Sequence, residues 1–329
     1  MRRREFITLL GSAVAASVSG PPDASAQNAS SYRLGALGPR DAFDEKSPFG
    51  SILIRVLAKN GYALGQNLAF DARGAKGEMH RVPQLLQEMK AEKVDAFVVF
   101  GFPLALAAKT LGIPTVVAFG AGDPVATGLV QSLSRPAGSL TGISDNATEL
   151  STKRLSLLRQ VNPKLRRVAM LWNRDDLGMS RRYEASAKVA QSVDLIVMPL
   201  GVSEPDDFNE AFEAMDHEPP DAILMVSDSL TTLNRKRVFN YAAERKLPAI
   251  YEYDFLVRDG GLMSYGADLN ESFERAGDLV ARIFKGAQPG DLPFEQPTRY
   301  PFVINLKTAK ATGIELPPNL VALADEVIE

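Results

Sequence analysis

The residues best placed to bind a small molecule stand directly after short apolar runs of the sequence. They are Arg40, Phe102, Asp123, Asn173, Asp228, Glu252, Tyr265 and Gly266. If the apolar runs are parallel strands, these residues gather at the carboxyl ends of the strands, where open α/β sheets bind ligands. Arg40 or a helix N-terminus can hold a carboxylate, and Asp123, Asp228 or Glu252 can hold an amine. The set predicts a site for a small charged organic molecule.

Most of these residues also have a structural interpretation. Asp123, which precedes a proline, can cap a helix or set a turn, and Asn173 and Asp228 can cap helices. Phe102 can be a core aromatic residue. Tyr265 is the strongest candidate for ligand contact, because a Tyr-Gly pair after a strand places a ring and a hydroxyl at an open edge. We expect Tyr265, Asp123 and Asp228 on facing walls of one cleft, with Phe102 near its mouth.

Signatures of catalysis and of cofactor binding are missing from the sequence. With no cysteine and two histidines, His80 and His217, a zinc site of nitrogen and sulfur ligands is disfavoured. Both histidines stand in polar surroundings and are expected at the surface. The glycine-rich stretch 120–124 lacks the third glycine of a dinucleotide fingerprint, and the stretch 261–266 does not fit a nucleophile elbow. We expect no catalytic residues, no metal and no cofactor.

Apolar runs alternate with amphipathic stretches along the chain. Strands are expected at residues 32–37, 68–71, 94–100, 113–119, 167–172, 195–199, 222–226, 248–251, 260–265 and 300–305. Helices are expected at residues 49–60, 79–91, 104–111, 149–161, 180–191, 206–215, 233–245, 269–285 and 319–328. Such alternation is typical of βαβ units with parallel sheets and right-handed crossovers.

The strand–helix pattern restarts after a stretch rich in Gly, Ser and Thr at residues 138–146, which predicts two doubly wound α/β lobes. We expect the N-terminal lobe to comprise residues 27–146 plus 264–292. The C-terminal lobe would comprise residues 147–263 plus 293–329. The chain would thus return to the first lobe after Tyr265, and the strand at 300–305 would join the second lobe.

The N-terminal 26 residues are built like an export signal. Arg2, Arg3 and Arg4 precede a short apolar run at residues 7–18, and the residues up to Ala26 form a small-residue cleavage site. The order of Arg3, Arg4 and the following Glu-Phe-Ile resembles a twin-arginine signal. A membrane anchor is the alternative, but the run is shorter than the roughly 20 residues that span a bilayer. We expect cleavage near Ala26/Gln27 and a periplasmic protein without a lipid anchor, since no cysteine is present.

The bulk composition limits the kinds of partner. The formal net charge is −3, and no basic run occurs outside the export signal, so neither nucleic acid nor an anionic membrane is an expected partner. Hydrophobic residues make up 45% of the chain, enough for a core without disulfides. We expect a monomer.

Several stretches resemble the solute-binding proteins of ABC transporters, specifically the group that includes TrpX-like tryptophan and tyrosine binding proteins. The matching stretches are residues 3–10 (RREFITLL), 120–142 (GAGDPVATGLVQSLSRPAGSLTG), 260–266 (GGLMSYG), 292–298 (LPFEQPT), 303–310 (VINLKTAK) and 324–329 (ADEVIE). The resemblance implies a type I periplasmic-binding-protein fold, in which three crossing segments join two Rossmann-like lobes around a ligand. It points to the loops at Asp123, Asn173, Asp228 and Tyr265-Gly266. The chain departs from the family pattern at Phe102, which would narrow the cleft or stack on a flat ligand.

Together these observations predict a periplasmic receptor for a small amino acid or carboxylate, aromatic ones included. Its expected partners are this solute and an ABC permease with its ATPase, to which it would deliver the solute after hinge closure. A ligand sensor for a receptor kinase is an alternative. Another is an enzyme on the same scaffold, in which paired carboxylates such as Asp123 and Asp228 would do acid–base work.

Overall fold

The computed structural model describes residues 31–144 and 146–329. The predicted export signal at residues 1–26 lies outside this description. Within the described ranges, no helix has the length and apolar character needed to cross a membrane.

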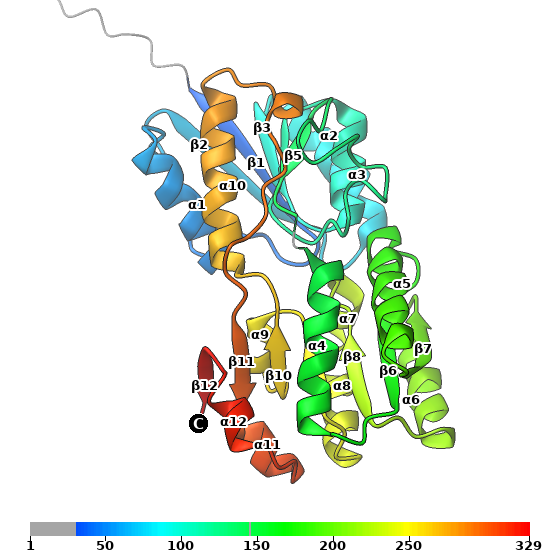
Figure 1. Cartoon of the computed structure of the whole chain (residues 1–329). Helices are drawn as coiled ribbons and strands as arrows, with labels where there is room; N and C mark the ends of the chain where they lie inside the picture. Colours follow the sequence, from blue (N-terminus) through cyan, green and yellow to red (C-terminus); the bar gives the residue numbers. More distant parts are fainter. Residues whose placement is uncertain (1–30, 145) are drawn as a thin grey trace, which may run out of the picture. The chain divides into compact units, whose positions relative to one another are not determined.

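The first sheet has five parallel strands in the order β2-β1-β3-β4-β5 (Figure 1). They are β1 (Tyr32–Gly38), β2 (Leu68–Gly74), β3 (Ala96–Val99), β4 (Thr115–Val117) and β5 (Leu140–Gly142). Its helical elements are α1 (Pro48–Lys59), η1 (Met79–Arg81), α2 (Val82–Ala91), α3 (Phe102–Leu111) and α10 (Leu269–Phe284). The fully buried residues of β3 explain its unbroken apolar sequence, since helices cover both faces of the sheet.

Helices α1 and α10 cover one face of this sheet, and α2 and α3 pack in a separate core on the other. Figure 1 shows α1 and α10 side by side although more than 200 residues separate them in sequence. Their close approach depends on Gly277, where an added Cβ would lie 2.8 Å from a methyl carbon of Val56. The chain after β10 therefore returns to the core of the first sheet.

The second sheet has seven strands in the order β12-β11-β10-β9-β8-β6-β7. They are β6 (Arg167–Asn173), β7 (Ile196–Val202), β8 (Ala222–Met225), β9 (Ala249–Tyr251), β10 (Met263–Tyr265), β11 (Phe302–Asn305) and β12 (Glu326–Ile328). Its helices are α4 (Ala147–Val161), α5 (Leu177–Ser192), α6 (Asp207–His217), α7 (Ser229–Leu233), α8 (Arg235–Glu244), α9 (Asp254–Arg258), α11 (Leu306–Thr312) and α12 (Pro318–Val321). All pairs are parallel except β10 with β11.

Three segments carry the chain between the two sheets: one after β5, one between β10 and α10, and one between the short helix η2 (Pro289–Asp291) and β11. The last segment enters the second sheet from the direction of the first, which explains why β11 runs antiparallel to β10. The second and third segments are tied together by the backbone N–H of Asp268, which donates a 3.1 Å hydrogen bond to the Arg299 carbonyl. The third segment is also tied to the first turn of α10 at Glu271, whose carboxylate accepts hydrogen bonds from the backbone N–H of Thr298 and of Arg299. The Thr298 hydroxyl donates a further bond of 2.6 Å.

Two sequence predictions about the C-terminal part need correction. The expected lobe boundary at residue 264 falls inside β10, which pairs wholly within the second sheet. The helix expected at 319–328 is a single turn, α12, followed by strand β12. Only Leu320 of that turn is buried, so little apolar surface is available to stabilise a longer helix, and Glu326–Ile328 pair with β11 instead.

Candidate ligand-binding cavity

A cavity of about 1140 Å³ lies where loops at the carboxyl ends of strands from both sheets meet. The first sheet contributes residues after β1, β2, β3 and β4, and the second contributes residues after β6, β7, β8, β9 and β10. The volume suits a small organic ligand, and the position at the strand ends is the one expected of doubly wound sheets.

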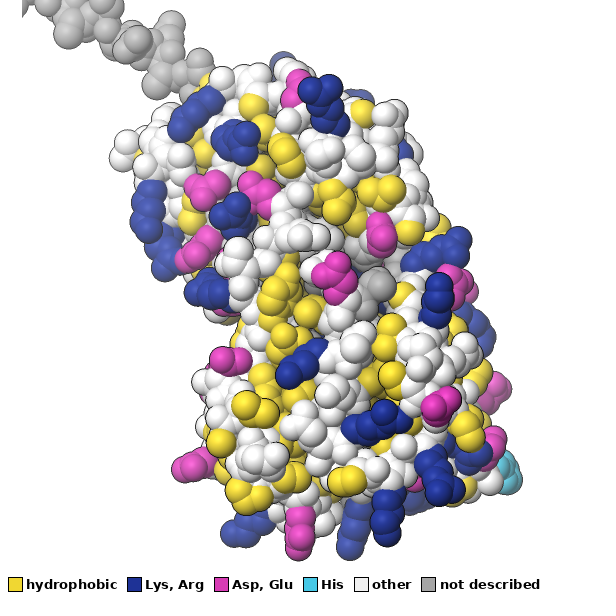
Figure 2. All heavy atoms as spheres, viewed as in Figure 1, with side chains coloured by type: hydrophobic (Ala, Val, Ile, Leu, Met, Phe, Trp, Pro, Cys, Tyr) yellow, Lys and Arg dark blue, Asp and Glu magenta, His cyan; other side chains and the backbone are white. Residues whose placement is uncertain are grey.

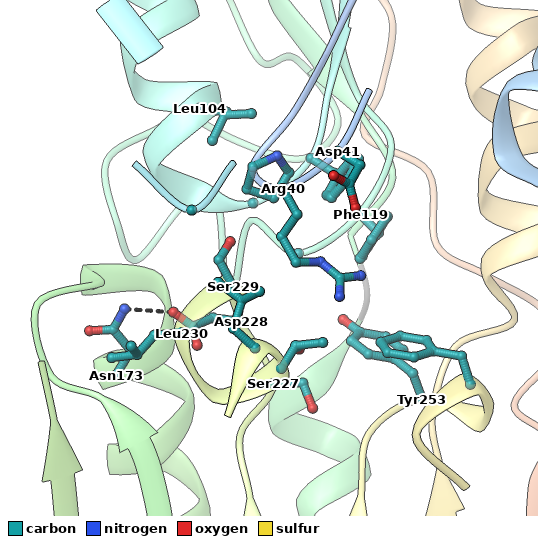
Figure 3. A pocket seen from close by; sticks show the side chains of 18 of the residues that line it. Arg40, Asp41, Leu104, Phe119, Asn173, Ser227, Asp228, Ser229, Leu230 and Tyr253 are labelled. Carbon is teal, nitrogen blue, oxygen red and sulfur yellow. Dashed lines mark hydrogen bonds between the residues drawn. The ribbon is translucent and has the colours of Figure 1, made fainter. Parts of the chain in front are cut away.

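Arg40 enters the cavity from the loop after β1 (Figure 3). The neighbouring loop after β2 holds this segment, because the backbone N–H of Lys76 donates a 2.7 Å hydrogen bond to the Arg40 carbonyl. The packing is so close that a Cβ at Gly74 would lie 2.3 Å from the same carbonyl oxygen. Burial and the nearby charge of Arg235 lower the pKa of Arg40. Among the described residues its guanidinium has no hydrogen bond or ion pair, so it is available to an anionic ligand group.

Two carboxyl groups, Asp176 and Asp228, lie on the side of the cavity formed by the second sheet. Asp176 caps α5 by accepting from the backbone N–H of Met179, and Asp228 caps α7 through Thr231. The side-chain amide of Asn173 donates to Asp228 at 2.6 Å, the bond drawn in Figure 3. Burial raises the pKa of both carboxyls, and the charge of Asp228 helps to raise that of Asp176 to about 7.

Aromatic side chains form an apolar shelf in the cavity. Six of them line it: Phe43, Phe49, Phe100, Phe119, Tyr253 and Phe255. The Phe100 and Phe119 rings stack with centroids 4.8 Å apart, and Tyr253 meets Phe119 edge-on at 5.6 Å. Stacked and edge-on rings of this kind suit a flat, apolar ligand group.

Three of the eight residues expected from the sequence line the cavity: Arg40, Asn173 and Asp228. Two others have the structural roles considered as alternatives. Phe102, the first residue of α3, is only 5% exposed and packs in the core that α2 and α3 form against the first sheet. Asp123 is exposed and sets a turn, because its carboxylate accepts from the backbone N–H groups of Val125 and Ala126. A catalytic pair of Asp123 with Asp228 is therefore contradicted.

Tyr265, Gly266 and Glu252 also lie outside the cavity, so the expectation that Tyr265 faces Asp228 across it is wrong. Tyr265 packs against the core of the second sheet, since β10 leads directly into the crossing segment. A Cβ at Gly266 would lie 1.8 Å from the Glu252 carbonyl oxygen, so this close backbone contact requires glycine.

Glu252 has a positioning role instead of the ligand contact expected of it. Its carboxylate is 2% exposed and pairs with Arg154 at 3.2 Å and with Arg182 at 2.9 Å. It also accepts a 2.9 Å hydrogen bond from the backbone N–H of Ser227, which lines the cavity. With two guanidinium partners already in place, this carboxylate is not free to hold an amine.

Asp176 and the aromatic shelf were missed by the sequence reasoning. The helix that begins at Leu177 was expected to begin at residue 180, and a start three residues earlier identifies Asp176 as its cap. Phe100 and Phe119 end apolar runs and therefore resemble core residues in the sequence. His80 and His217 are exposed, as predicted, and the described residues contain no cluster of three potential metal ligands.

The arrangement of the two sheets is shared with solved structures. A structure of a conserved domain protein from Vibrio cholerae covers 90% of this chain and 99% of its own, with a TM-score of 0.83 and 23% identity. The ABC domain from Streptococcus pneumoniae in complex with L-Trp covers 91% and 100%, with a TM-score of 0.81 and 23% identity. The fold is the type I periplasmic-binding-protein fold, as the sequence resemblance implied.

The chain belongs to the family described as ABC transporter substrate binding protein, whose model matches residues 48–328. A tyrosine-binding protein of Clostridioides difficile is 26% identical over 264 residues, which are 80% of this chain and 75% of the relative. The resemblance to TrpX-like proteins drawn from the sequence is confirmed.

Proposed function

We propose that this protein is the periplasmic solute receptor of an ABC importer and that its solute is an aromatic amino acid or aromatic carboxylate. The observation that carries the proposal is the cavity itself. In it, Arg40, whose guanidinium has no ion pair among the described residues, and a shelf of aromatic rings meet at the strand ends. Arg40 would bind the carboxylate of the solute, and the rings of Phe100, Phe119 and Tyr253 would contact its flat side chain. The tyrosine-binding and L-Trp-bound relatives support this choice of solute.

Capture would involve closure of two lobes about the three crossing segments. The N-terminal lobe would hold the first sheet with α10, and the C-terminal lobe would hold the second sheet, with the boundary after β10 in place of residue 264. The receptor would be exported with cleavage near Ala26/Gln27, act as a monomer and deliver its solute to a permease and its ATPase. The mixture of acidic and basic side chains on the face seen in Figure 2 agrees with a small-molecule partner in place of nucleic acid.

Ligand-dependent thermal stabilisation tests this function. The purified protein is heated alone and with L-tryptophan, L-tyrosine, benzoate or a sugar alcohol. A ligand that binds only the folded state raises the melting temperature, so we expect a rise with the aromatic compounds and none with the sugar alcohol. Stabilisation by the sugar alcohol alone would contradict the proposal.

A substitution at Arg40 tests the role of this residue. Arg40→Gln removes the positive charge from the cavity and should weaken binding of the responding aromatic ligand by about 30-fold or more. Arg55→Gln is the matched control, because Arg55 lies on the outer surface of α1 in an exposed pair with Glu274. If the two variants bind the ligand with equal affinity, Arg40 does not bind the solute.

A further inference from the structure

Loops of the two sheets touch directly at the wall of the cavity. Leu233, the last residue of α7, packs against Gly77 in the loop after β2, and both residues line the cavity. The contact is close, because a Cβ at Gly77 would lie 2.9 Å from a methyl carbon of Leu233. Gly77 also has a φ of +82°, which glycine adopts without strain. The cavity wall thus includes one residue from each sheet, packed against the other.

A second contact joins the two sheets at the start of α5. Gly178 lies against Phe102, the first residue of α3, and against Ala121 in the loop after β4, and all three residues are buried. A Cβ at Gly178 would lie 2.9 Å from the Phe102 Cβ and 3.2 Å from the Ala121 carbonyl oxygen. Neither atom can rotate away, since the first is attached to the backbone and the second belongs to it. The approach of these segments therefore depends on glycine at position 178.

Both sides of the first contact are held in place by hydrogen bonds. The loop of Gly77 is attached to the loop after β1, because the backbone N–H of Gly77 donates a 2.8 Å hydrogen bond to the Pro39 carbonyl. Helix α7 is fixed at its start by the capping box of Asp228 and Thr231. Leu233 and Gly77 thus belong to two well-supported segments, and movement of one sheet away from the other would break their contact.

We propose that the contacts of Leu233 with Gly77 and of Gly178 with Phe102 and Ala121, here called the closing contacts, form when the lobes close and scale the affinity for every solute by one common factor. The inference rests on the proposed function, because it requires closure about a solute. The closing contacts join protein to protein, so their contribution does not depend on which solute is enclosed. The apparent dissociation constant includes the free energy of reaching the closed state as well as the contacts with the solute.

Leu233→Ala removes one closing contact. Leu233 is 49% exposed, so the change should alter the stability of the empty protein little. We expect it to weaken binding of L-tryptophan and of L-tyrosine by the same factor, about two- to fivefold, because the contact buries only part of the side chain. The dissociation rate should rise by this factor while the association rate stays unchanged, since the contact is absent when the solute enters. Calorimetric titration and stopped-flow mixing measure these quantities.

Gly178→Ala blocks the second closing contact. The added methyl group does not fit between Phe102 and Ala121 in the closed protein, so both affinities should fall by about tenfold or more. Within its own lobe the methyl carbon lies 3.1 Å from a carboxylate oxygen of Asp176, which ends a side chain and can shift. Alanine is favoured over glycine in a helix, so the melting temperature of the empty protein should not fall. General loss of folding would not weaken binding in this way.

Leu323→Ala is the matched control for Leu233→Ala. Leu323 is 58% exposed and does not line the cavity. The control removes the same atoms without affecting a closing contact, so both affinities should keep their wild-type values. Melting curves of each empty variant accompany the titrations.

The outcomes separate this inference from the proposed function. If the wild type binds the amino acids and the variants at Leu233 and Gly178 bind them equally tightly, the inference is overturned while the receptor function stands. If Leu233→Ala weakens binding of only one amino acid, Leu233 contacts the solute and the inference is wrong. If Gly178→Ala lowers the melting temperature of the empty protein and keeps the affinity, the second contact is permanent, which also overturns the inference. If the wild type binds none of the aromatic compounds, both proposals are overturned.

Discussion

The backbone N–H of Ser227 donates a 2.9 Å hydrogen bond to Oε2 of Glu252, so a carboxylate outside the cavity holds in place a segment that lines it. Glu252 is itself fixed between Arg154 and Arg182. The buried ion pairs beneath the second sheet and the position of Ser227 are therefore parts of one hydrogen-bonded network.

Glu252→Gln should weaken both the fold and the site. The change removes the carboxylate charge that two buried guanidinium groups share, which should lower the free energy of unfolding by about 3–5 kcal/mol. Urea denaturation measures this loss. Glu274→Gln removes an exposed partner of Arg55 and should cost less than about 1 kcal/mol. Equal losses for the two variants would show that the buried network does not stabilise the protein.

The stability of the empty protein should decline as the pH rises from about 4 to about 7. Burial raises the pKa of Asp176 from 3.8 to about 7, so in this window the folded protein keeps a proton that the unfolded chain has lost. The shift corresponds to at most about 4 kcal/mol, fully expressed above pH 7. Asp176→Asn should remove this contribution, so its stability relative to wild type should increase with pH. If the free energies of unfolding of wild type and Asp176→Asn change in parallel with pH, the raised pKa of Asp176 is contradicted.

Tyr265→Ala should destabilise the protein while leaving solute affinity nearly unchanged. Tyr265 packs against the second core, and removal of its partly buried ring should cost about 2–3 kcal/mol. Unfolding and titration of the same variant separate the two effects. A lower solute affinity with an unchanged free energy of unfolding would indicate instead that Tyr265 contacts the solute.

Phe119→Leu should weaken binding of an aromatic solute because it removes one ring of the stacked pair with Phe100. Loss of an aromatic contact corresponds to about 0.5–1.5 kcal/mol, or roughly two- to tenfold in affinity. Phe212→Leu is the control, since the Phe212 ring stacks on Tyr241, away from the cavity. An equal effect of both changes on affinity would argue against the aromatic shelf.

Replacement of Arg2, Arg3 and Arg4 by lysine should leave the precursor in the cytoplasm, because twin-arginine export depends on the guanidinium pair. Fractionation of cells that produce wild-type or variant protein measures the distribution. Normal arrival of the variant in the periplasm would exclude this export route.

The sequence was sufficient to predict most of the fold, because helix-covered strands such as β3 and amphipathic helices such as α2 have distinct periodicities. It was less informative about the cavity. Asp123 precedes a turn and Asp176 precedes a helix, so the two look alike in the sequence. Only the packing of loops that are distant in the sequence determines that Asp176 lines the cavity and Asp123 does not. Glu252 looks like a free acid in the sequence because its two arginine partners are about 70 and 100 residues away in the chain.

The bonds that join Arg299 to Asp268 and to Glu271 would restrict any movement of one sheet relative to the other. Two adjacent segments that are hydrogen-bonded to each other can bend together, but they cannot slide past each other without breaking these bonds. A rearrangement that preserves these bonds has few degrees of freedom. Such a rearrangement would be close to a rotation of one sheet relative to the other about an axis near the paired segments. The loops farthest from this axis would then be displaced most.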